Sequence, residues 1–177
     1  MLSNVELIVL SLVNEKPAYA YEIEKQIEAR NMRLWVRIGI ASIYQVLERL
    51  HKKGYVRFEV EREGKAPERK RYFITAAGLE ELKATVKELL SKLEWFYLDL
   101  NVAIAASDVL EPSEALQSLE RRLNIVRHSI KRLREMYAED STGSAKGNAV
   151  IRNLLGFREA EEKLLVEYIE TRFKADL

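Results

Sequence analysis

The spacing of apolar residues predicts short helices and two strands in the first part of the chain and long helices in the rest. Before residue 54, apolar positions recur every three or four residues, which is typical of amphipathic helices. Residues 55–61 alternate between apolar and charged side chains, which predicts a strand, and residues 70–75 form the return strand after a polar connection. After residue 75 the apolar spacing is helical again, and no further strand is predicted.

Residues 39–75 follow the order helix, strand, polar loop and strand, which is the second half of a winged helix-turn-helix. The helix has an apolar inward face, made by Ile43, Val46, Leu47 and Leu50. Its outward face is polar, with Ser42, Gln45, Arg49 and Lys52, and with Tyr44 on the flank. Gly54 ends the helix, because glycine adopts a left-handed backbone conformation without strain.

The outward helix face and the loop that follows have the chemistry of a DNA-binding surface. Hydroxyl, amide and guanidinium groups hydrogen-bond base edges and phosphates, and a basic hairpin can lie along the adjacent backbone. Between Arg49 and Arg71 there are nine Lys and Arg against four Glu, a net charge of +5. The same pattern also fits a small α+β domain with a solvated charged face.

The distribution of charge along the chain favours the DNA interpretation. The net charge of the 177 residues is only +1, but residues 1–75 carry 14 Lys and Arg and 10 Asp and Glu, a net charge of +4. The remaining residues carry 15 and 18, a net charge of −3. A polyanion would therefore bind the region that has the winged-helix pattern.

Several other classes of protein are not supported by the sequence. The absence of cysteine excludes disulfides, thiolate metal sites and cysteine nucleophiles. His51 and His128 lie in no cluster with metal-ligand spacing, and there is neither a Gly-rich phosphate loop nor a nucleophile elbow. We therefore expect no enzyme, no metal and no cofactor. The N-terminal apolar run is broken by Ser11 and follows no basic segment, so neither a signal peptide nor a membrane span is expected.

The first two helices raise questions of packing. The first begins at Ser3, with Glu6 completing a capping box, and its apolar residues cover nearly the whole circumference. A helix of this kind is buried on more than one side, so a second subunit is the simplest partner for the outer side, which includes Val9. Tyr21 lies near the start of the second helix, predicted for about residues 19–30, where it either contacts phosphate or packs in the core.

The C-terminal region, residues 79–177, is predicted to be a three-helix, coiled-coil-like dimerisation domain after a DNA-binding domain in residues 1–78. The helices are expected at about residues 75–106, 112–138 and 149–174. In the first two, apolar residues are spaced alternately by three and four, a seam that is buried only against another helix. The predicted interface residues are Leu89, Leu93, Leu100, Leu119, Leu123, Val126, Ile130 and Leu154. The predicted fold is therefore mainly α.

Four segments resemble motifs of the PadR family of bacterial and archaeal transcriptional regulators. They are AYAYEI at residues 18–23, ASIYQVLERL at 41–50, GYV at 54–56 and RKRYFITAAG at 69–78. The helical tail resembles the virulence-activator type of C-terminal domain found in the larger members. The sequence differs from the motifs where Ala20 and Ala41 replace glycine and Gln45 replaces proline. Because glutamine can pair with adenine, the base preference can differ from that of relatives.

The resemblance implies a cytoplasmic, nucleoid-associated homodimer that binds operator DNA, most often as a repressor. It places a set of residues near DNA, namely Tyr21, Ser42, Tyr44, Lys70 and Arg71, together with the wing tip from Lys65 to Arg69. Some members bind aromatic effectors between the C-terminal helices and the DNA-binding domains. Trp95, Phe96 and Tyr97 lie where such a site would be, or they pack at the dimer core. The alternatives are a winged-helix module that binds protein and an activator that has no small-molecule effector.

Overall fold

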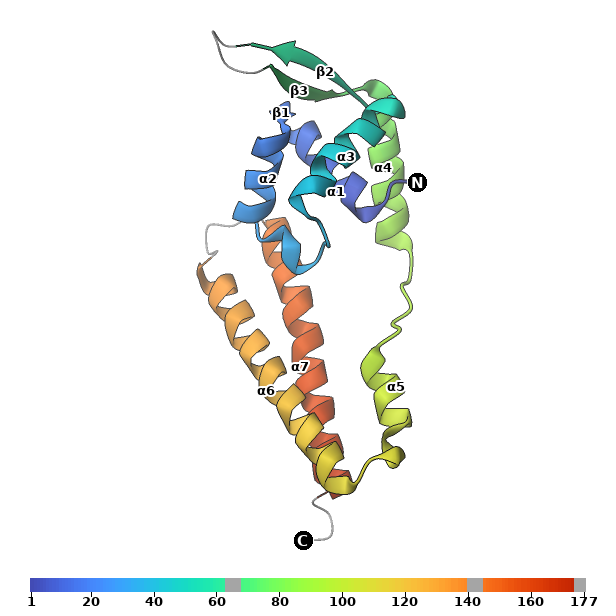
Figure 1. Ribbon diagram of the computed structural model, residues 1–177, viewed down its shortest axis with the longest axis vertical. Helices are drawn as coiled ribbons and strands as arrows, with labels where there is room; N and C mark the ends of the chain where they lie inside the picture. Colours follow the sequence, from blue (N-terminus) through green and yellow to red (C-terminus); the bar gives the residue numbers. More distant parts are fainter. Residues whose placement is uncertain (63–67, 140–144, 174–177) are drawn as a thin grey trace. The chain divides into compact units, whose positions relative to one another are not determined.

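The protein, described as a computed structural model, is mainly helical, with one small antiparallel sheet (Figure 1). The structure describes residues 1–62, 68–139 and 145–173, so the predicted wing-tip residue Lys65 lies outside the described residues. Among the described helices, none combines the length and the apolar character that crossing a bilayer requires.

The chain divides into two compact units, Met1–Glu94 and Trp95–Leu177. The predicted boundary at residues 78/79 falls within helix α4 (Ala76–Ser91), which packs against α1 (Asn4–Glu15) in the first unit. The whole of α4 therefore belongs to the first unit.

The first unit is the predicted winged helix-turn-helix. After α1 its elements are β1 (Ala18–Tyr19), α2 (Ala20–Ala29), a short 3-10 helix (Met32–Leu34), α3 (Ile40–Lys52), β2 (Val56–Glu61), β3 (Arg69–Ile74) and α4. The strands β2 and β3 form the predicted antiparallel hairpin, and β1, which the sequence analysis missed, pairs with the other edge of β3. In Figure 1 this hairpin extends from the helices of the unit.

The core of the first unit is closed within the chain. Its fully buried side chains come from the first three helices and β2, namely Val9, Leu10, Leu12, Val13, Ile23, Ile27, Ile43, Val46, Leu47, Leu50 and Val56. Helix α1 contacts α2, α3, α4 and β3, so elements of the same chain pack against more than one side of it. The burial of Val9 therefore needs no second copy, whereas a second subunit over the half-buried Val5, Leu7 and Ile8 stays a prediction.

The predicted boundaries of the helices follow local rules. Ser3 and Glu6 form the predicted capping box of α1, and Gly54 after α3 has a φ of 74°. Thr75 caps α4 by accepting a hydrogen bond from the backbone N–H of Gly78 at 3.0 Å. A Cβ atom on Gly78 would lie 2.1 Å from the carbonyl oxygen of Tyr55, so only glycine lets α4 start this close to the strand.

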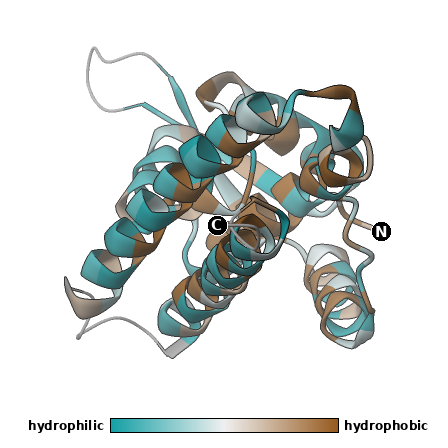
Figure 2. Ribbon diagram, turned by 90° about the horizontal axis from the view of Figure 1, so that it is seen from below, coloured by the Kyte–Doolittle hydropathy of each residue, from teal (hydrophilic) through white to brown (hydrophobic). Residues whose placement is uncertain are grey.

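The second unit is built on two long helices, α6 (Pro112–Glu139) and α7 (Ala145–Phe173), which lie side by side (Figure 1). Helix α5 (Asp99–Ala105) and a short 3-10 helix (Ser107–Val109) precede them. The apolar cluster of this unit consists of Leu100, Leu123, Val126, Ile130, Leu165 and Ile169. Figure 2 shows hydrophobic stripes beside hydrophilic ones along the helices, as the seam pattern predicts.

The predicted continuous helix through residues 75–106 was wrong. Helix α4 ends at Ser91, residues 92–98 are not helical, and α5 begins at Asp99. Most helical stability in proteins comes from packing of an apolar face, and aromatic residues are weak helix formers. Leu93, Trp95 and Tyr97 are 78%, 79% and 91% exposed, so packing supports no helix across this segment.

The predicted interface residues fall into three groups. Leu100, Leu123, Val126 and Ile130 are buried in the cluster of the second unit. Leu89, Leu119 and Leu154 are half-buried, and Leu93 is exposed. The seam of α6 is thus covered by α7 of the same chain, whereas Leu93 has no comparable cover.

Candidate nucleic-acid interface

The outward face of α3 is held in place by the residues beneath it. Ile43 and Leu47 are fully buried in the core, which turns the opposite side of the helix toward solvent. The predicted DNA-facing residues of α3 lie on that side: Ser42 is half-buried, and Tyr44, Gln45, Arg49 and Lys52 are exposed. The structure therefore brings hydroxyl, amide and cationic groups to one accessible helix face.

A carboxylate on α1 binds two cations at the end of α3. Lys53 Nζ lies 2.8 Å and Arg49 Nε lies 3.7 Å from Oε1 of Glu6, a residue that is only 5% exposed. Burial alone would raise the pKa of Glu6, but hydrogen bonds from Lys53 and Ser3 outweigh it, so the pKa is lowered. Arg49, predicted to face DNA, is thus partly held toward α1, and Glu6 ties α1 to the last turn of α3.

Arg69 and Lys70 are neighbours on β3, and their side chains lie on opposite faces of the sheet because side chains alternate along a strand. Lys70 shares its face with buried Tyr72, and its Nζ lies 4.3 Å from the ring centroid of Phe58. On this side Lys52, and to a smaller extent Lys70, lower the pKa of Glu48 on α3. Lys70 therefore belongs to the side of the wing that faces α3.

The opposite face of the wing lies next to the start of α2. Arg69 is exposed, and its guanidinium lies 5.8 Å from the ring centroid of Tyr21. Tyr21 is 41% exposed and stacks on Tyr19, with ring centroids 5.5 Å apart and an interplanar angle of 10°. Of the two alternatives for Tyr21, the structure favours the surface position over the core.

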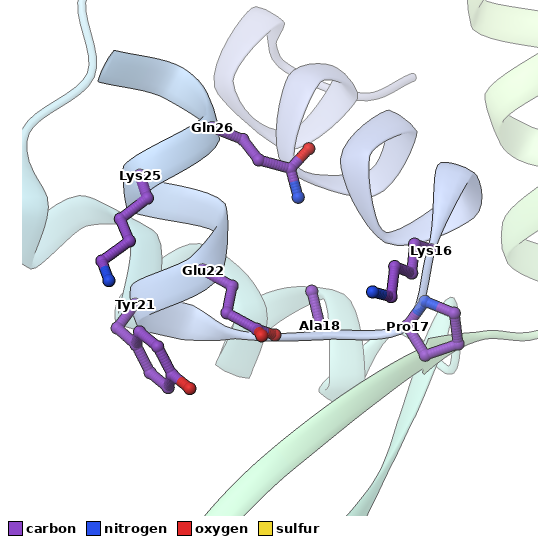
Figure 3. Close-up of a pocket in the computed structure, with 7 residues that line it drawn as sticks. All are labelled: Lys16, Pro17, Ala18, Tyr21, Glu22, Lys25 and Gln26. Atoms are coloured by element: carbon purple, nitrogen blue, oxygen red, sulfur yellow. The ribbon is translucent and has the colours of Figure 1, made fainter. Parts of the chain in front are cut away.

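A shallow pocket of about 310 Å³ adjoins Tyr21 along α2. It is lined by Lys16, Pro17, Ala18, Tyr21, Glu22, Lys25 and Gln26, as Figure 3 shows. In this view Lys25 extends on the same side of α2 as Tyr21, and its Nζ lies 5.7 Å from the centroid of the Tyr21 ring. Cations thus approach the ring of Tyr21 from both α2 and β3.

Sequence analysis missed a polar cluster where β1 meets the hairpin. The Tyr19 hydroxyl donates a hydrogen bond to Glu61, and Arg71 Nη2 donates to the Tyr19 oxygen at 3.1 Å. Arg71 Nε lies 3.3 Å from Glu61 Oε1, which is ion-pair distance although not hydrogen-bond geometry. The hydrogen bond to Glu61, together with burial, raises the pKa of Tyr19, because the carboxylate stabilises the protonated phenol.

One local signal pointed to part of this cluster. The period of two along β2 places Glu61 on the same face as Arg57 and Glu59, and the register pairs Glu59 with Arg71 and Glu61 with Arg69. Opposite charges on facing strands would have predicted ion pairs there. The participation of Tyr19 depends on β1, which is too short to be recognised from its sequence.

The predicted ligand residues are exposed and do not line a shared pocket among the described cavities. Trp95 and Tyr97 are almost fully exposed, whereas Phe96 packs edge-on against Phe157 with ring centroids 5.2 Å apart. A cavity of about 320 Å³ in the same unit is lined by other residues, namely Arg127, Ile130, Lys131, Arg134, Glu135 and Glu162. In the part of the chain that the structure describes, no three His, Asp or Glu side chains are placed to hold a metal ion.

The sequence matches the Transcriptional regulator PadR-like family over residues 9–84. A curated relative, an uncharacterised protein of Lysinibacillus sphaericus, is 34% identical over 85 residues, which are 48% of this chain and 77% of that protein. The family match over residues 9–84 includes α2, α3 and both strands of the wing.

Solved structures with a similar fold cover almost the whole chain. Bacillus subtilis PadR in complex with operator DNA superposes with a TM-score of 0.81 at 16% identity, covering 97% of this chain and 99% of that one. The same protein in complex with p-coumaric acid gives 0.73 at 16% identity, with 97% and 98% covered. The Vibrio cholerae virulence activator AphA gives 0.71 at 16% identity, with 95% and 97% covered. At these identities the likeness concerns the fold alone.

Proposed function

The chain belongs to the PadR-like family of transcriptional regulators, and we propose that it represses transcription as a homodimer bound to a palindromic operator. In this proposal α3 reads base edges through Ser42, Tyr44 and Gln45. The cations of α3 and β3, namely Arg49, Lys52, Arg69, Lys70 and Arg71, contact phosphates, together with Tyr21 and the wing-tip residue Lys65. Phosphate contacts orient the protein on the duplex, and base contacts give the specificity.

The observation that carries the proposal is the continuity of the surface from α2 across the wing to α3. Arg69 on one face of β3 lies against Tyr21 of α2, and Lys70 on the other face lies near Glu48 of α3. The two faces of the wing therefore carry cations next to both helices, one beside the start of α2 and the other beside α3. A surface of this extent suits a duplex, in which the recognition helix lies in the major groove and neighbouring groups touch the backbone.

The dimer is supported by the apolar residues that the chain leaves uncovered. Leu90, Leu93, Trp95 and Tyr97 lie close together in sequence and are largely exposed. Large apolar side chains left exposed often mark protein interfaces, and we propose that a second copy covers these four. Two recognition helices in one dimer read half-sites about one helical turn, or ~34 Å, apart. Many weak contacts then combine into a usable specificity.

A small aromatic effector is the second part of the proposal. Bacillus subtilis PadR has been solved in complex with p-coumaric acid, and the aromatic side chains of Trp95, Phe96 and Tyr97 have the chemistry to bind such a molecule. A ligand that binds one arrangement of the dimer more tightly changes the spacing of the recognition helices and releases the operator. The competing role for these three residues is packing at the dimer core.

Binding of duplex DNA tests the proposal directly. Operator fragments are selected from random-sequence DNA with the purified protein, and affinity is measured across a range of salt concentrations. We expect log K to fall linearly with log salt, and Lys70→Ala to reduce the slope by about one while weakening all sequences alike. Lys83→Ala serves as the control, because it removes the same single positive charge from α4, where Lys83 pairs with Glu80. A salt-independent interaction with a protein partner would favour the alternative winged-helix module.

Gln45 tests the specific part of the surface. Gln45→Ala should relax the preference at one base position in each half-site, because glutamine pairs with adenine through two hydrogen bonds. The selection is repeated with the variant, and an unchanged base preference would show that Gln45 reads no base.

A reporter gene behind the selected operator distinguishes repression from activation. Addition of p-coumaric acid to the same assay tests whether an aromatic effector releases the protein from the operator.

A further inference from the structure

We propose that Glu61 is a positioning residue for DNA binding: it holds Tyr19 and Arg71, and through them it fixes the ring of Tyr21 at the start of α2. The role rests on the proposed function. It differs from the role of a contact residue, because Glu61 has the same sign of charge as the phosphates that the surface would bind.

The cluster connects β1 to the β2–β3 hairpin, which β1 meets at only two paired positions. Strand β1 has only two residues, Ala18 and Tyr19, and pairs with β3 at Tyr72 and Arg71. Tyr19 is also the N-cap of α2, and its backbone N–H donates to the Glu22 carboxylate at 2.9 Å. The position of Tyr19 therefore sets the position of the first turn of α2.

Side-chain contacts connect Tyr19 to Glu61, Arg71 and Tyr21. The Tyr19 hydroxyl is held by Glu61 on one side and by Arg71 on the other. The Arg71 guanidinium also lies 4.7 Å from the centroid of the Tyr19 ring. The Tyr19 ring in turn stacks nearly parallel on the Tyr21 ring. A chain of contacts thus runs from Glu61 on β2 to Tyr21 on α2.

The effect of Glu61 should be larger on DNA binding than on stability. The side chains of Glu61 and Arg71 are 41% and 38% exposed, and exposed ion pairs add little to folding free energy. A guanidinium has five N–H donors, so Arg71 can hold Glu61 and Tyr19 and still donate to a phosphate. Glu61 thus orders the phosphate-binding groups before DNA arrives, which lowers the entropy lost on binding.

Glu59 provides a matched control. It lies two residues from Glu61 on the same strand and the same sheet face, and it pairs with Arg57 instead of Tyr19. If negative charge were all that mattered, removing either carboxylate would tighten DNA binding by a similar factor. A positioning role predicts opposite signs for the two variants.

The experiment measures the affinity of four proteins for a duplex selected by the wild-type chain. Glu59→Ala should bind as tightly as wild type or more tightly. Glu61→Ala should bind about three- to tenfold more weakly, the range expected for one lost hydrogen bond. Glu61→Gln, which can still accept the hydrogen bond from Tyr19, should recover most of the affinity. Far-ultraviolet circular dichroism and the melting temperature verify that each variant is folded.

Two further measurements distinguish positioning from charge. Tyr19→Phe should weaken binding about as much as Glu61→Ala, and the double variant should show little additional loss, because both changes break the same contact. NMR titration of ring-labelled tyrosine should show that Glu61→Ala lowers the pKa of Tyr19 toward its ordinary value, because the hydrogen-bonded carboxylate is gone.

The outcomes separate the two proposals. Tighter binding by Glu61→Ala, matching Glu59→Ala, would overturn the positioning role while leaving DNA binding intact. Additive losses in the double variant would also overturn it. A wild-type protein that binds no duplex even at low salt would overturn the proposed function, and the positioning role with it.

Discussion

Two stretches of the chain have the same apolar spacing but form different structures. Residues 79–103 and 116–137 both place apolar side chains alternately three and four positions apart. The second stretch forms α6, and its residues Leu123, Val126 and Ile130 are no more than 9% exposed. The first stretch breaks after Ser91 and leaves most of its central apolar side chains exposed.

The difference lies in the partner available to each stretch. Helix α7 covers α6, and three arginines of α6 reach glutamates of α7, in the pairs Arg122–Glu161, Arg127–Glu162 and Arg134–Glu159. Among the described residues, no element covers the segment around Leu93 to the same extent. An apolar seam therefore predicts that a face will be covered, but it does not predict what covers it.

The largest expected effect is on the covered stretch. Leu123→Asp places a charge in the cluster between α6 and α7 and should destabilise the second unit by about 4 kcal/mol or more. Ile125→Asp, on the exposed side of the same helix, should leave stability nearly unchanged. Chemical unfolding followed by circular dichroism measures both. If the Leu123→Asp protein stays folded and only fails to form a dimer, Leu123 lies at the subunit interface and not in the core of the second unit.

A charge in the exposed stretch around Leu93 should affect self-association and not folding. Leu93→Asp should leave the fold intact but weaken self-association by about 2 to 4 kcal/mol, the cost of a hot-spot residue at an interface. Sedimentation velocity over a range of concentrations measures this change. Leu93→Met keeps the apolar surface and should remain dimeric. If Leu93→Asp sediments as wild type does, the second copy does not cover this segment.

A smaller effect should come from the ion pair that closes α6 on α7. Arg122 Nε donates to Glu161 Oε1 at 2.7 Å. Burial alone would raise the pKa of Glu161, but hydrogen bonds from Arg122 and Arg158 outweigh it and lower the pKa. The pair should therefore contribute about 1 kcal/mol above the unfolded-state pKa of about 4.3, and lose it as the pH falls through the lower folded-state pKa.

Thermal unfolding of wild type and Glu161→Gln tests this pH dependence. Wild type should be more stable at pH 7, and the difference should disappear in acid below the folded-state pKa. Glu167→Gln changes an exposed carboxylate on the same helix and should have little effect at pH 7. A constant difference between wild type and Glu161→Gln down to acid pH would exclude a contribution from the ionised carboxylate.

Local rules were enough to predict the main helices and the hairpin of the winged helix, but not β1. The capping box at Ser3, the left-handed Gly54 and the alternation along β2 each depend on residues within about four positions, so sequence spacing carries them. The polar face of α3 was also predictable, because burial of Ile43 and Leu47 decides which side remains outside. The exposed position of Tyr21 was not, since it depends on packing between α2 and β3.

The sequence by itself determined the positions of most helices and strands, the polarity of their faces and the family to which the chain belongs. Only the tertiary structure decided which faces meet. Glu6 contacts Lys53, and Tyr19 contacts both Glu61 and Arg71, across more than 40 residues of chain. Such contacts depend on the path of the whole backbone, and a residue's neighbours in sequence do not specify them.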